Sequence, residues 1–390
     1  MKKRRTIFPR LLSLVLILSV FSAPSIRTRV DTREKLNTVS DYAYLSVQQS
    51  DSNCTLQQKN DSVAVGSRLF ELIFGKKKSN GSYEDIKLCP GGDAFGVKIF
   101  GSGITVTKVV TELSSGILKA DDRILSIDGK RVSCIDEVKE ILNSSGGREL
   151  SFEISRGGKN FTAKIAPKSA GGEYHLGVIL SDGASGIGTV TYYDPATCAF
   201  GGLGHGICAH DGTDVLNMAK GQVTGVILAG TSRGEASKPG ELRGVLTDKI
   251  LGTLTANTEC GVFGTISPDA VKGESESTAI PIAKKQDVHP GEATIISTVK
   301  NGKKAEYKIE IGDVDYSSAG TKSFRIKVTD DTLIALTGGI VRGMSGSPII
   351  QDGKLVGAVT HVMVADPTEG YGIFIENMLN AAEMPMAKAS

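Results

Sequence analysis

Short apolar runs separated by glycine-rich turns fill most of the chain after residue 88. Examples of the runs are "GVKIF", "QVTGVIL" and "KLVGAVTHV", and examples of the turns are "IDGK", "KNGK" and "QDGK". Runs of this length, bounded by Gly, Asn and Asp, are typical of β-strands joined by tight turns. We therefore predict a mainly β protein, in which only "IDEVKEILN" and "IENMLNAAEM" have the spacing of one apolar helical face.

Changes in this pattern predict two folded regions. Residues 89–168 contain short strands, the first helical segment and a hairpin around "RGGK". Residues 171–390 contain about ten β-like runs, which predicts a β-barrel or a pair of small barrels. Residues 27–88 are polar and irregular, and we expect a stalk or linker there.

The first 26 residues have the composition of an export signal. A basic cluster, "MKKRR", precedes the apolar run "LLSLVLILSVF" and the small residues "SAPS". The apolar run is short compared with the about 20 residues of a transmembrane helix, so a signal peptide is favoured over an uncleaved membrane anchor. We expect a protein that works outside the cytoplasm.

Composition and charge argue against several other classes. The chain has 47 glycines and no tryptophan, and the basic residues before residue 27 account for its net charge of +2, so nothing indicates nucleic-acid binding. Its six cysteines form no CxxC pair, and both disulfide bridges and free buried thiols remain open. Its five histidines are scattered, and we expect neither a metal nor a cofactor.

The segment "GMSGSPIIQ" has the form of a nucleophile loop. Small residues around Ser345 let backbone N–H groups turn toward a developing oxyanion, and we assign this role to the N–H groups of Gly343 and Ser345. The loop resembles the "G-D-S-G-G-P" loop of chymotrypsin-like proteases, in which Ser345 is the aligned nucleophile and Ser347 replaces a glycine. A glycine-rich turn without chemistry is the alternative.

A serine nucleophile needs a base and an acid that orients the base. His205 lies in the glycine-rich bend "FGGLGHGICAH", well before Ser345, as in two-barrel proteases whose histidine comes from the first barrel. A metal site of His205, His210 and Asp211 is the alternative. For the acid, Asp330 and Asp331 follow the run "SFRIKV", where a strand end can direct a carboxylate into a cleft.

The two aspartates have an alternative use, because either can cap the segment "TLIAL" that follows them. Sequence spacing does not separate Asp330 from Asp331. Thr337, Gly338 and Gly339, just before the nucleophile loop, are candidates for lining a specificity pocket.

Residues 89–168 resemble a PDZ domain. The segment "GILKADDRILSIDGKRV" follows the pattern "GL-x-x-GD-x-I-x-x-ING-x-x-V" of that family, with Ala120 at a usual glycine. PDZ domains add an extended peptide as a strand to a sheet edge. The resemblance makes "PGGDAFGVKI" the binding loop and strand, with peptide-binding candidates Gly91, Gly92, Phe95 and Gly96. The chain's own N-terminal segment is one candidate ligand, and a vestigial groove is the alternative.

From about residue 88 to the C-terminus, the chain resembles the SpoIVB peptidases of endospore-forming bacteria. The resemblance is carried by "FGGLGHGI", by "KVTDDTLIALTGGIVRGMSGSPIIQDGKLVGAVTH" and by the PDZ-like region before them. It implies a PDZ-like domain followed by a chymotrypsin-like double β-barrel. It also implies that His205, Asp330 and Ser345 form a catalytic triad.

The same resemblance implies a biological role. SpoIVB peptidases are secreted by the forespore into the space between its two membranes, cleave themselves, and cleave an extracytoplasmic part of a membrane-bound regulator. This cleavage signals the activation of a late mother-cell sigma factor. We therefore expect a sporulation serine endopeptidase acting on protein substrates, with activity that falls on acidification through a His205 pKa near 6.5. A PDZ-type peptide-binding protein without catalysis is the alternative.

Overall fold

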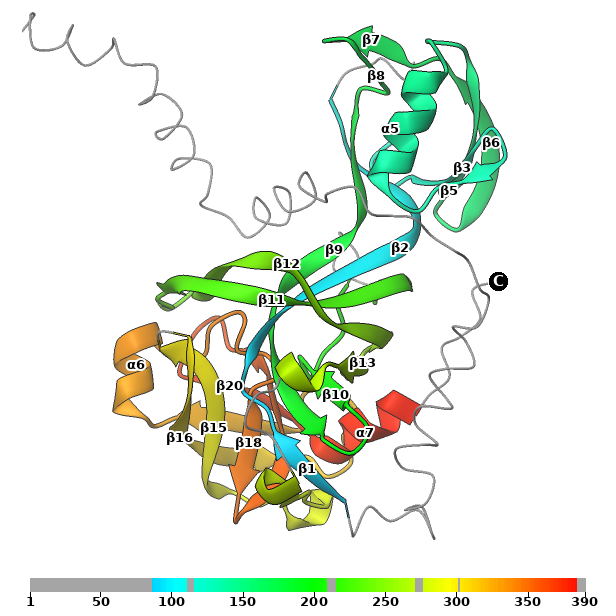
Figure 1. The fold of residues 1–390 in the computed structure, drawn as a ribbon. Helices are drawn as coiled ribbons and strands as arrows, with labels where there is room; N and C mark the ends of the chain where they lie inside the picture. The colour runs from blue at the N-terminus through cyan, green and yellow to red at the C-terminus, as the bar shows by residue number, and fades with distance from the viewer. Residues whose placement is uncertain (1–85, 111–115, 209–214, 271–275, 301, 384–390) are drawn as a thin grey trace, which may run out of the picture. The chain divides into compact units, whose positions relative to one another are not determined.

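The computed structural model describes residues 86–110, 116–208, 215–270, 276–300 and 302–383 (Figure 1). The expected export signal and almost all of the expected stalk lie outside these residues. Within the described part of the chain, no helix is both long enough and apolar enough to span a membrane.

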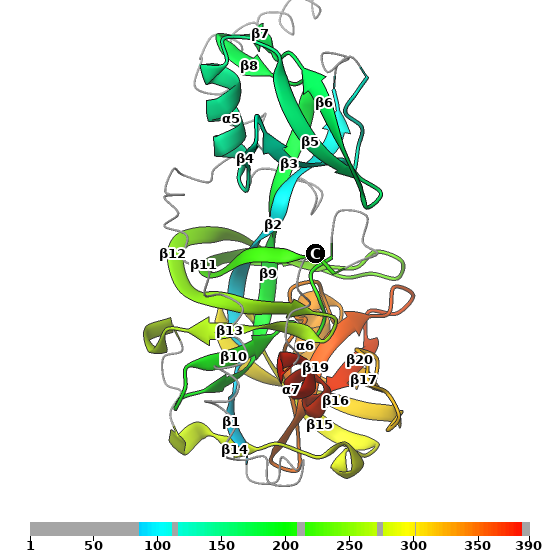
Figure 2. The ribbon, with the colours of Figure 1, turned by 90° about the vertical axis from the view of Figure 1, so that its right-hand side faces the viewer.

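Six antiparallel strands pair in a closed circuit and form the first barrel. Pairing runs from β2 through β11, β12, β13 and β10 to β9, and β9 pairs again with β2. Figures 1 and 2 both show β11 beside β12 and β10 beside β13. The strands are β2 (Ala94–Val109), β9 (Val178–Asp194), β10 (Ala199–Gly202), β11 (Met218–Ser232), β12 (Glu241–Thr258) and β13 (Gly261–Ile266).

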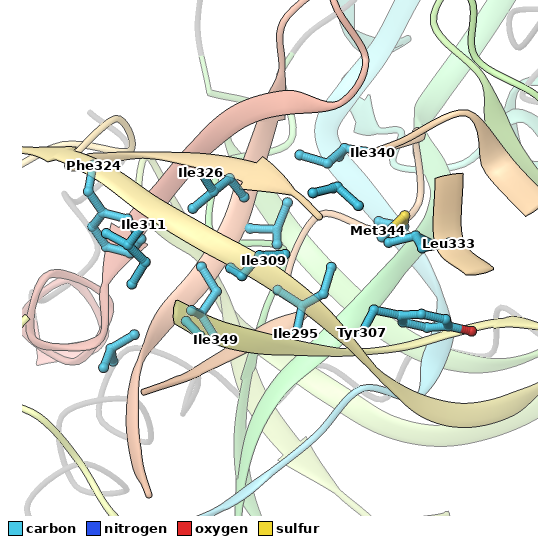
Figure 3. Packing of buried hydrophobic residues seen from close by; sticks show 14 of the residues in the cluster. Ile295, Tyr307, Ile309, Ile311, Phe324, Ile326, Leu333, Ile340, Met344 and Ile349 are labelled. Atoms are coloured by element: carbon cyan, nitrogen blue, oxygen red, sulfur yellow. The ribbon is translucent and has the colours of Figure 1, made fainter. Parts of the chain in front are cut away.

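Six further strands form the second barrel, which is closed in the order β15, β16, β17, β20, β19 and β18. Buried and exposed positions alternate along β17, as expected for a strand with one face toward a core. Figure 3 shows this core, where Met344 of the nucleophile loop lies beside Leu333. The bounds are β15 (Gly291–Lys300), β16 (Lys303–Val314), β17 (Phe324–Val328), β18 (Pro348–Gln351), β19 (Lys354–Val362) and β20 (Glu369–Phe374).

The PDZ-like region is an insertion within the first barrel. Residues 94–100 of β2 pair with residues 183–189 of β9 inside the barrel, whereas residues 105–109 pair with residues 178–181 beyond it. We call residues 101–182 the inserted module. It has its own apolar core, which contains Ile104, Ile124 and Phe152. Its remaining elements are β3 (Arg123–Ile127), β4 (Lys130–Arg131), α5 (Ile135–Ser144), β5 (Leu150–Arg156), β6 (Lys159–Ile165), β7 (Lys168–Ala170) and β8 (Glu173–His175).

Short helices and edge strands complete the fold. The helix α6 (Asp331–Thr337) lies between β17 and the nucleophile loop, and α7 (Ile375–Glu383) follows β20. The strand β1 (Lys87–Pro90) pairs with β9 and with β14 (Ile280–Pro281). The 3₁₀ helices are η2 (Pro268–Ala270), η3 (Glu276–Thr278) and η4 (Lys285–Asp287).

The structure confirms the mainly β fold class with a PDZ-like module and two barrels. The expected helices also form, because α5 and α7 coincide with the two helical patterns. The sheet pairing divides the chain differently from the expected boundaries at 89–168 and 171–390. Residues 94–100 belong to the first barrel, since they pair with β9 and β11, and β1 extends the sheet of that barrel by pairing with β9.

The segment that resembles the PDZ pattern has a structural role in the module. Asp122 is fully buried and accepts two hydrogen bonds from Arg156, at 2.6 Å from Nε and 2.7 Å from Nη2. Its carboxylate also accepts from the backbone N–H of Lys119 at 2.8 Å. A buried carboxylate requires such partners, so this aspartate fixes the loop before β3.

Candidate active site

The nucleophile loop connects α6 to β18 and contains Ser345. Gly343 and Gly346 flank this serine, and both have a φ of +95°, which favours glycine. At Gly346 a Cβ atom would lie 2.0 Å from the carbonyl oxygen of Thr189, so only glycine fits between the two barrels at this point. The Ser345 hydroxyl donates to the carbonyl oxygen of Thr360 at 2.9 Å.

Ser347 occupies a different environment from Ser345. Its side chain is completely buried, and its hydroxyl has no hydrogen-bond partner in the described part of the chain. A hydroxyl sealed in the interior cannot meet a substrate. The structure therefore makes Ser345 the accessible serine of the pair.

The two expected oxyanion donors make no hydrogen bond to another group among the described residues. Neither the N–H of Gly343 nor the N–H of Ser345 donates to a protein acceptor there, whereas the neighbouring N–H groups of Met344 and Gly346 donate to Val341 and Val359. Two N–H groups that lie two residues apart in this loop and have no acceptor among the described residues can stabilise the oxyanion of a tetrahedral intermediate.

His205 follows β10 and is half-buried. Its Nδ1 lies 2.9 Å from the carbonyl oxygen of Gly206, an acceptor, so Nδ1 carries the proton and Nε2 has the lone pair. Burial lowers the pKa of His205 below its ordinary value of 6.5, and the Gly206 carbonyl opposes this effect. His205 is therefore neutral at pH 7, as a general base must be.

Ser345 and His205 converge at the segment around Thr360. The carbonyl of Thr360 accepts from Ser345, and a Cβ at Gly204, next to His205, would lie 2.9 Å from the Thr360 side chain. The next residue, His361, has its ring centroid 5.4 Å from that of His205. The first barrel thus supplies His205 and the second barrel supplies Ser345.

His361 is a second imidazole at this site. Its Nδ1 is buried without a hydrogen-bond partner in the described residues. Burial, and then the positive charges of His205 and Lys322, lower the pKa of His361 to about 4. Two adjacent imidazoles that both resist protonation keep the site uncharged at neutral pH.

Asp330 makes its hydrogen bonds to other groups in the structure. It is the N-cap of α6, where its Oδ1 accepts from the N–H of Leu333 at 2.9 Å and its Oδ2 from the N–H of Lys308 at 3.3 Å. No hydrogen bond joins it to His205 within the described residues. Asp331 is the first residue of α6 and is exposed. The orienting contact expected from Asp330 is made here by the carbonyl of Gly206.

None of the four peptide-binding candidates lies in the inserted module: Phe95 and Gly96 are in β2 of the first barrel, and Gly91 and Gly92 are in the loop before it. The N–H groups of Gly91 and Gly92 donate to Thr191 and Val190 of β9 at 2.9 and 2.8 Å. Phe95 is buried and packs edge-to-face against Phe200, with ring centroids 5.8 Å apart. Gly96 pairs with β9 and β11, where a Cβ atom would lie 2.4 Å from the hydroxyl of Thr224.

The remaining sequence candidates have local structural roles. Thr337 is buried and its hydroxyl donates to the carbonyls of Leu333 and Gly339, while Gly338 ends α6 with a φ of +77°. His289 pairs with Asp352 at 2.9 Å on the surface. His210 and Asp211 lie outside the described residues, and the described residues contain no group of three or more side chains suited to a metal ion.

The sequence did not indicate the residues that hold the site together through their backbone groups and through a threonine hydroxyl. These are Gly206 and Thr360, whose carbonyls hold His205 and Ser345, and Thr189, which contacts the nucleophile loop. A threonine in a strand carries no signal of its own, because the same residue type is common throughout β-sheets.

Comparisons with known proteins place this site in a known family. The family model described as SpoIVB peptidase S55 matches residues 172–379. A 64-residue segment is 36% identical to the Lactococcus lactis protein named "Putative zinc metalloprotease LL2128", covering 16% of this chain and 15% of that relative's length. The chain thus spans about a seventh of that curated relative.

Two solved structures resemble parts of the chain. The PDZ domain of the SdrC-like protein Lmo2051 from Listeria monocytogenes is 26% identical, covers 21% of this chain and 90% of its own, and gives a TM-score of 0.20. The active form of the Rv3671c protease from Mycobacterium tuberculosis is 13% identical, covers 52% of this chain and 75% of its own, and gives a TM-score of 0.31. Because both TM-scores are low, the site is assigned from its own geometry.

Proposed function

Because the chain belongs to the SpoIVB peptidase S55 family, we propose that it is a serine endopeptidase with Ser345 as nucleophile and His205 as general base. One observation carries this proposal. Ser345 contacts Thr360 and His205 contacts the next residue, His361, and the N–H groups of Gly343 and Ser345 have no acceptor among the described residues.

The proposed mechanism is acyl transfer. The Ser345 hydroxyl leaves the Thr360 carbonyl and gives its proton to Nε2 of His205 as its oxygen attacks the peptide carbonyl carbon. The N–H groups of Gly343 and Ser345 stabilise the resulting oxyanion, and protonated His205 then gives the proton to the leaving amine. Water hydrolyses the acyl-enzyme by the same steps, which restores Ser345.

We retain Asp330 as the proposed acid of the active state. In that role its carboxylate would accept from His205 Nδ1, whereas in the structure it accepts from the N–H groups of Leu333 and Lys308. In the structure, the Gly206 carbonyl stabilises the His205 tautomer that carries its proton on Nδ1. A carboxylate would stabilise the imidazolium more strongly than a carbonyl does.

The proposed biological role is sporulation signalling. The family and the export-type N-terminus support secretion by the forespore, self-cleavage, and cleavage of an extracytoplasmic segment of a membrane-bound regulator. The inserted module is proposed to hold a peptide, either the substrate tail or the enzyme's own N-terminal segment.

The proposed activity is tested with full-length wild-type protein, Ser345→Ala and Ser347→Ala. Ser347 is a matched control because its buried, unpartnered hydroxyl can be removed with little effect. Self-cleavage and digestion of casein are followed by mass spectrometry at pH 8. We expect wild type and Ser347→Ala to cleave and Ser345→Ala to remain whole. Equal cleavage by all three variants would refute the assignment, and no cleavage by any of them would favour the binding protein.

A further inference from the structure

The strand β9 holds the nucleophile loop by three hydrogen bonds. The Thr189 N–H donates to the Ser345 carbonyl at 3.0 Å, and the Thr189 hydroxyl donates to the Gly343 carbonyl at 2.8 Å. The Thr191 hydroxyl donates to the Gly346 carbonyl at 2.8 Å. Both threonines are buried, with 1% and 0% of their surface exposed.

These bonds fix the peptide planes on either side of an oxyanion donor. The Ser345 N–H belongs to the peptide between Met344 and Ser345. The carbonyls of Gly343 and Ser345, which Thr189 holds, belong to the peptides immediately before and after it. Each residue has only two soft backbone dihedrals, so fixing both neighbouring planes restricts rotation of the plane between them.

The second donor is restrained through its own peptide. The carbonyl of Arg342 accepts from the N–H of Leu242 at 2.8 Å, and the Gly343 N–H belongs to the same peptide. In a trans peptide these two groups point in opposite directions, so anchoring the carbonyl on β12 directs the N–H away from that strand.

The presence of threonine rather than valine on this face of β9 indicates that the hydroxyl groups are needed as hydrogen-bond donors. Thr189 and Thr191 are two residues apart and therefore share one face of the strand, toward the nucleophile loop. A buried hydroxyl is costly unless it finds a partner, and a valine of the same shape would fill this space without that cost. The hydroxyls are thus placed where loop carbonyls need donors.

We propose that Thr189 and Thr191 are positioning residues that hold the Gly343 and Ser345 N–H groups in the orientation needed to bind an oxyanion. They act through the loop and do not touch the substrate. This inference rests on the proposed function, because it assigns a role in the same reaction.

Four threonine variants of the full-length protein test the inference. Thr189→Val and Thr191→Val remove one hydroxyl each and keep the β-branched shape, and Thr189→Ser restores the donor. Thr255→Val is the matched control, because its hydroxyl also donates to a backbone carbonyl of the first barrel, that of Phe263 at 3.2 Å, away from the loop. Casein digestion gives kcat and KM, and thermal unfolding gives the folded fraction.

We expect Thr189→Val to lower kcat about tenfold or more and to change KM little, since loss of a direct oxyanion donor costs about 100- to 1,000-fold. Thr191→Val should lower kcat less, and Thr189→Ser should recover most of the activity. The control Thr255→Val should keep the wild-type kcat. Wild-type kcat in both loop-facing variants, or losses explained by their unfolded fractions, would overturn the inference.

A crystal structure of Thr189→Val gives a result that does not depend on turnover. The peptide between Met344 and Ser345 is expected to rotate away from its wild-type orientation, and an unchanged orientation would also overturn the inference. A wrong proposed function would give a different result: wild type would be inactive, or Ser345→Ala would be active.

Discussion

Asp330 caps α6 in the structure and is also the proposed acid of the triad, and one substitution separates these two roles. Asparagine caps a helix as well as aspartate does but cannot stabilise an imidazolium by charge. Asparagine keeps the cap on Leu333 but loses the acceptor for the exposed, 3.3 Å hydrogen bond from Lys308, so we expect Asp330→Asn to lower the unfolding temperature only slightly and to lose activity by on the order of a thousandfold or more. The exposed Asp331→Asn is the control. Wild-type activity in Asp330→Asn would leave the orienting role to the Gly206 carbonyl.

The pH dependence of activity depends on the environment of His205. Burial lowers the pKa of His205, so the neutral base persists to a lower pH than in water. We expect kcat/KM to be constant near pH 7 and to fall as pH decreases through a midpoint below 6.5, which corrects the value near 6.5 expected from the sequence alone. Initial rates on casein between pH 4.5 and 8 measure this midpoint. A midpoint at or above 6.5 would contradict this environment and would indicate that the Asp330 carboxylate pairs with His205 in the active state.

At the scale of single residues, the sequence indicated which residues are candidates for catalysis, but it did not indicate which groups they contact. Ser345, Gly343 and His205 could be proposed from the sequence because nucleophile loops and catalytic bends need small flanking residues. The Asp330 carboxylate could not be placed, because a strand end followed by a helix serves equally well as a cap. Gly206 and Thr360 act through their carbonyls, which every residue has.

At the scale of elements, β2 and β9 each belong to two folding units. Local pattern predicted most strands and both α5 and α7, because these depend on the spacing of apolar residues along the chain. It could not show that β2 pairs first with β11 and later with β3, because strand partners are distant in sequence. The expected boundary therefore fell inside the first barrel.

This topology predicts how the inserted module can be removed. Phe100 and Gly183 are paired across β2 and β9, so an Asn-Gly turn can replace residues 101–182 and close a hairpin. We expect the shortened protein to unfold cooperatively on heating and to digest casein. Deleting residues 89–168 instead removes part of β1 and the barrel half of β2, and we expect it to abolish folding. Similar behaviour of the two deletions in circular dichroism would contradict the insertion.

At the scale of the whole molecule, the proposed catalysis requires contact between the two barrels. Gly346 of the nucleophile loop lies against Thr189 and Leu203 of the first barrel, and a Cβ there would lie 2.0 Å and 2.5 Å from their backbone atoms. The sequence indicated the order of the two barrels. It did not indicate this contact, because a glycine in a loop is equally typical of a simple turn.

Gly346→Ala tests the contact between the barrels. Left-handed backbone alone costs about 1–2 kcal/mol for an alanine. Gly353→Ala is the matched control, because Gly353 has a φ of +74° and open space around its Cβ position. We expect Gly346→Ala to lose more unfolding free energy in urea than the control and to lose its activity. Equal stability of the two variants would show that the barrels do not approach so closely.

Covalent trapping of Ser345 tests the central claim most directly. Full-length wild type, Ser345→Ala and His205→Ala are treated with diisopropyl fluorophosphate, and the labelled residue is located by peptide mass spectrometry. We predict one adduct on Ser345 in wild type, none in Ser345→Ala, and much slower labelling in His205→Ala, because the serine needs its base. An adduct at another residue, or labelling of Ser345 that is equally fast without His205, would contradict the proposed nucleophile and base.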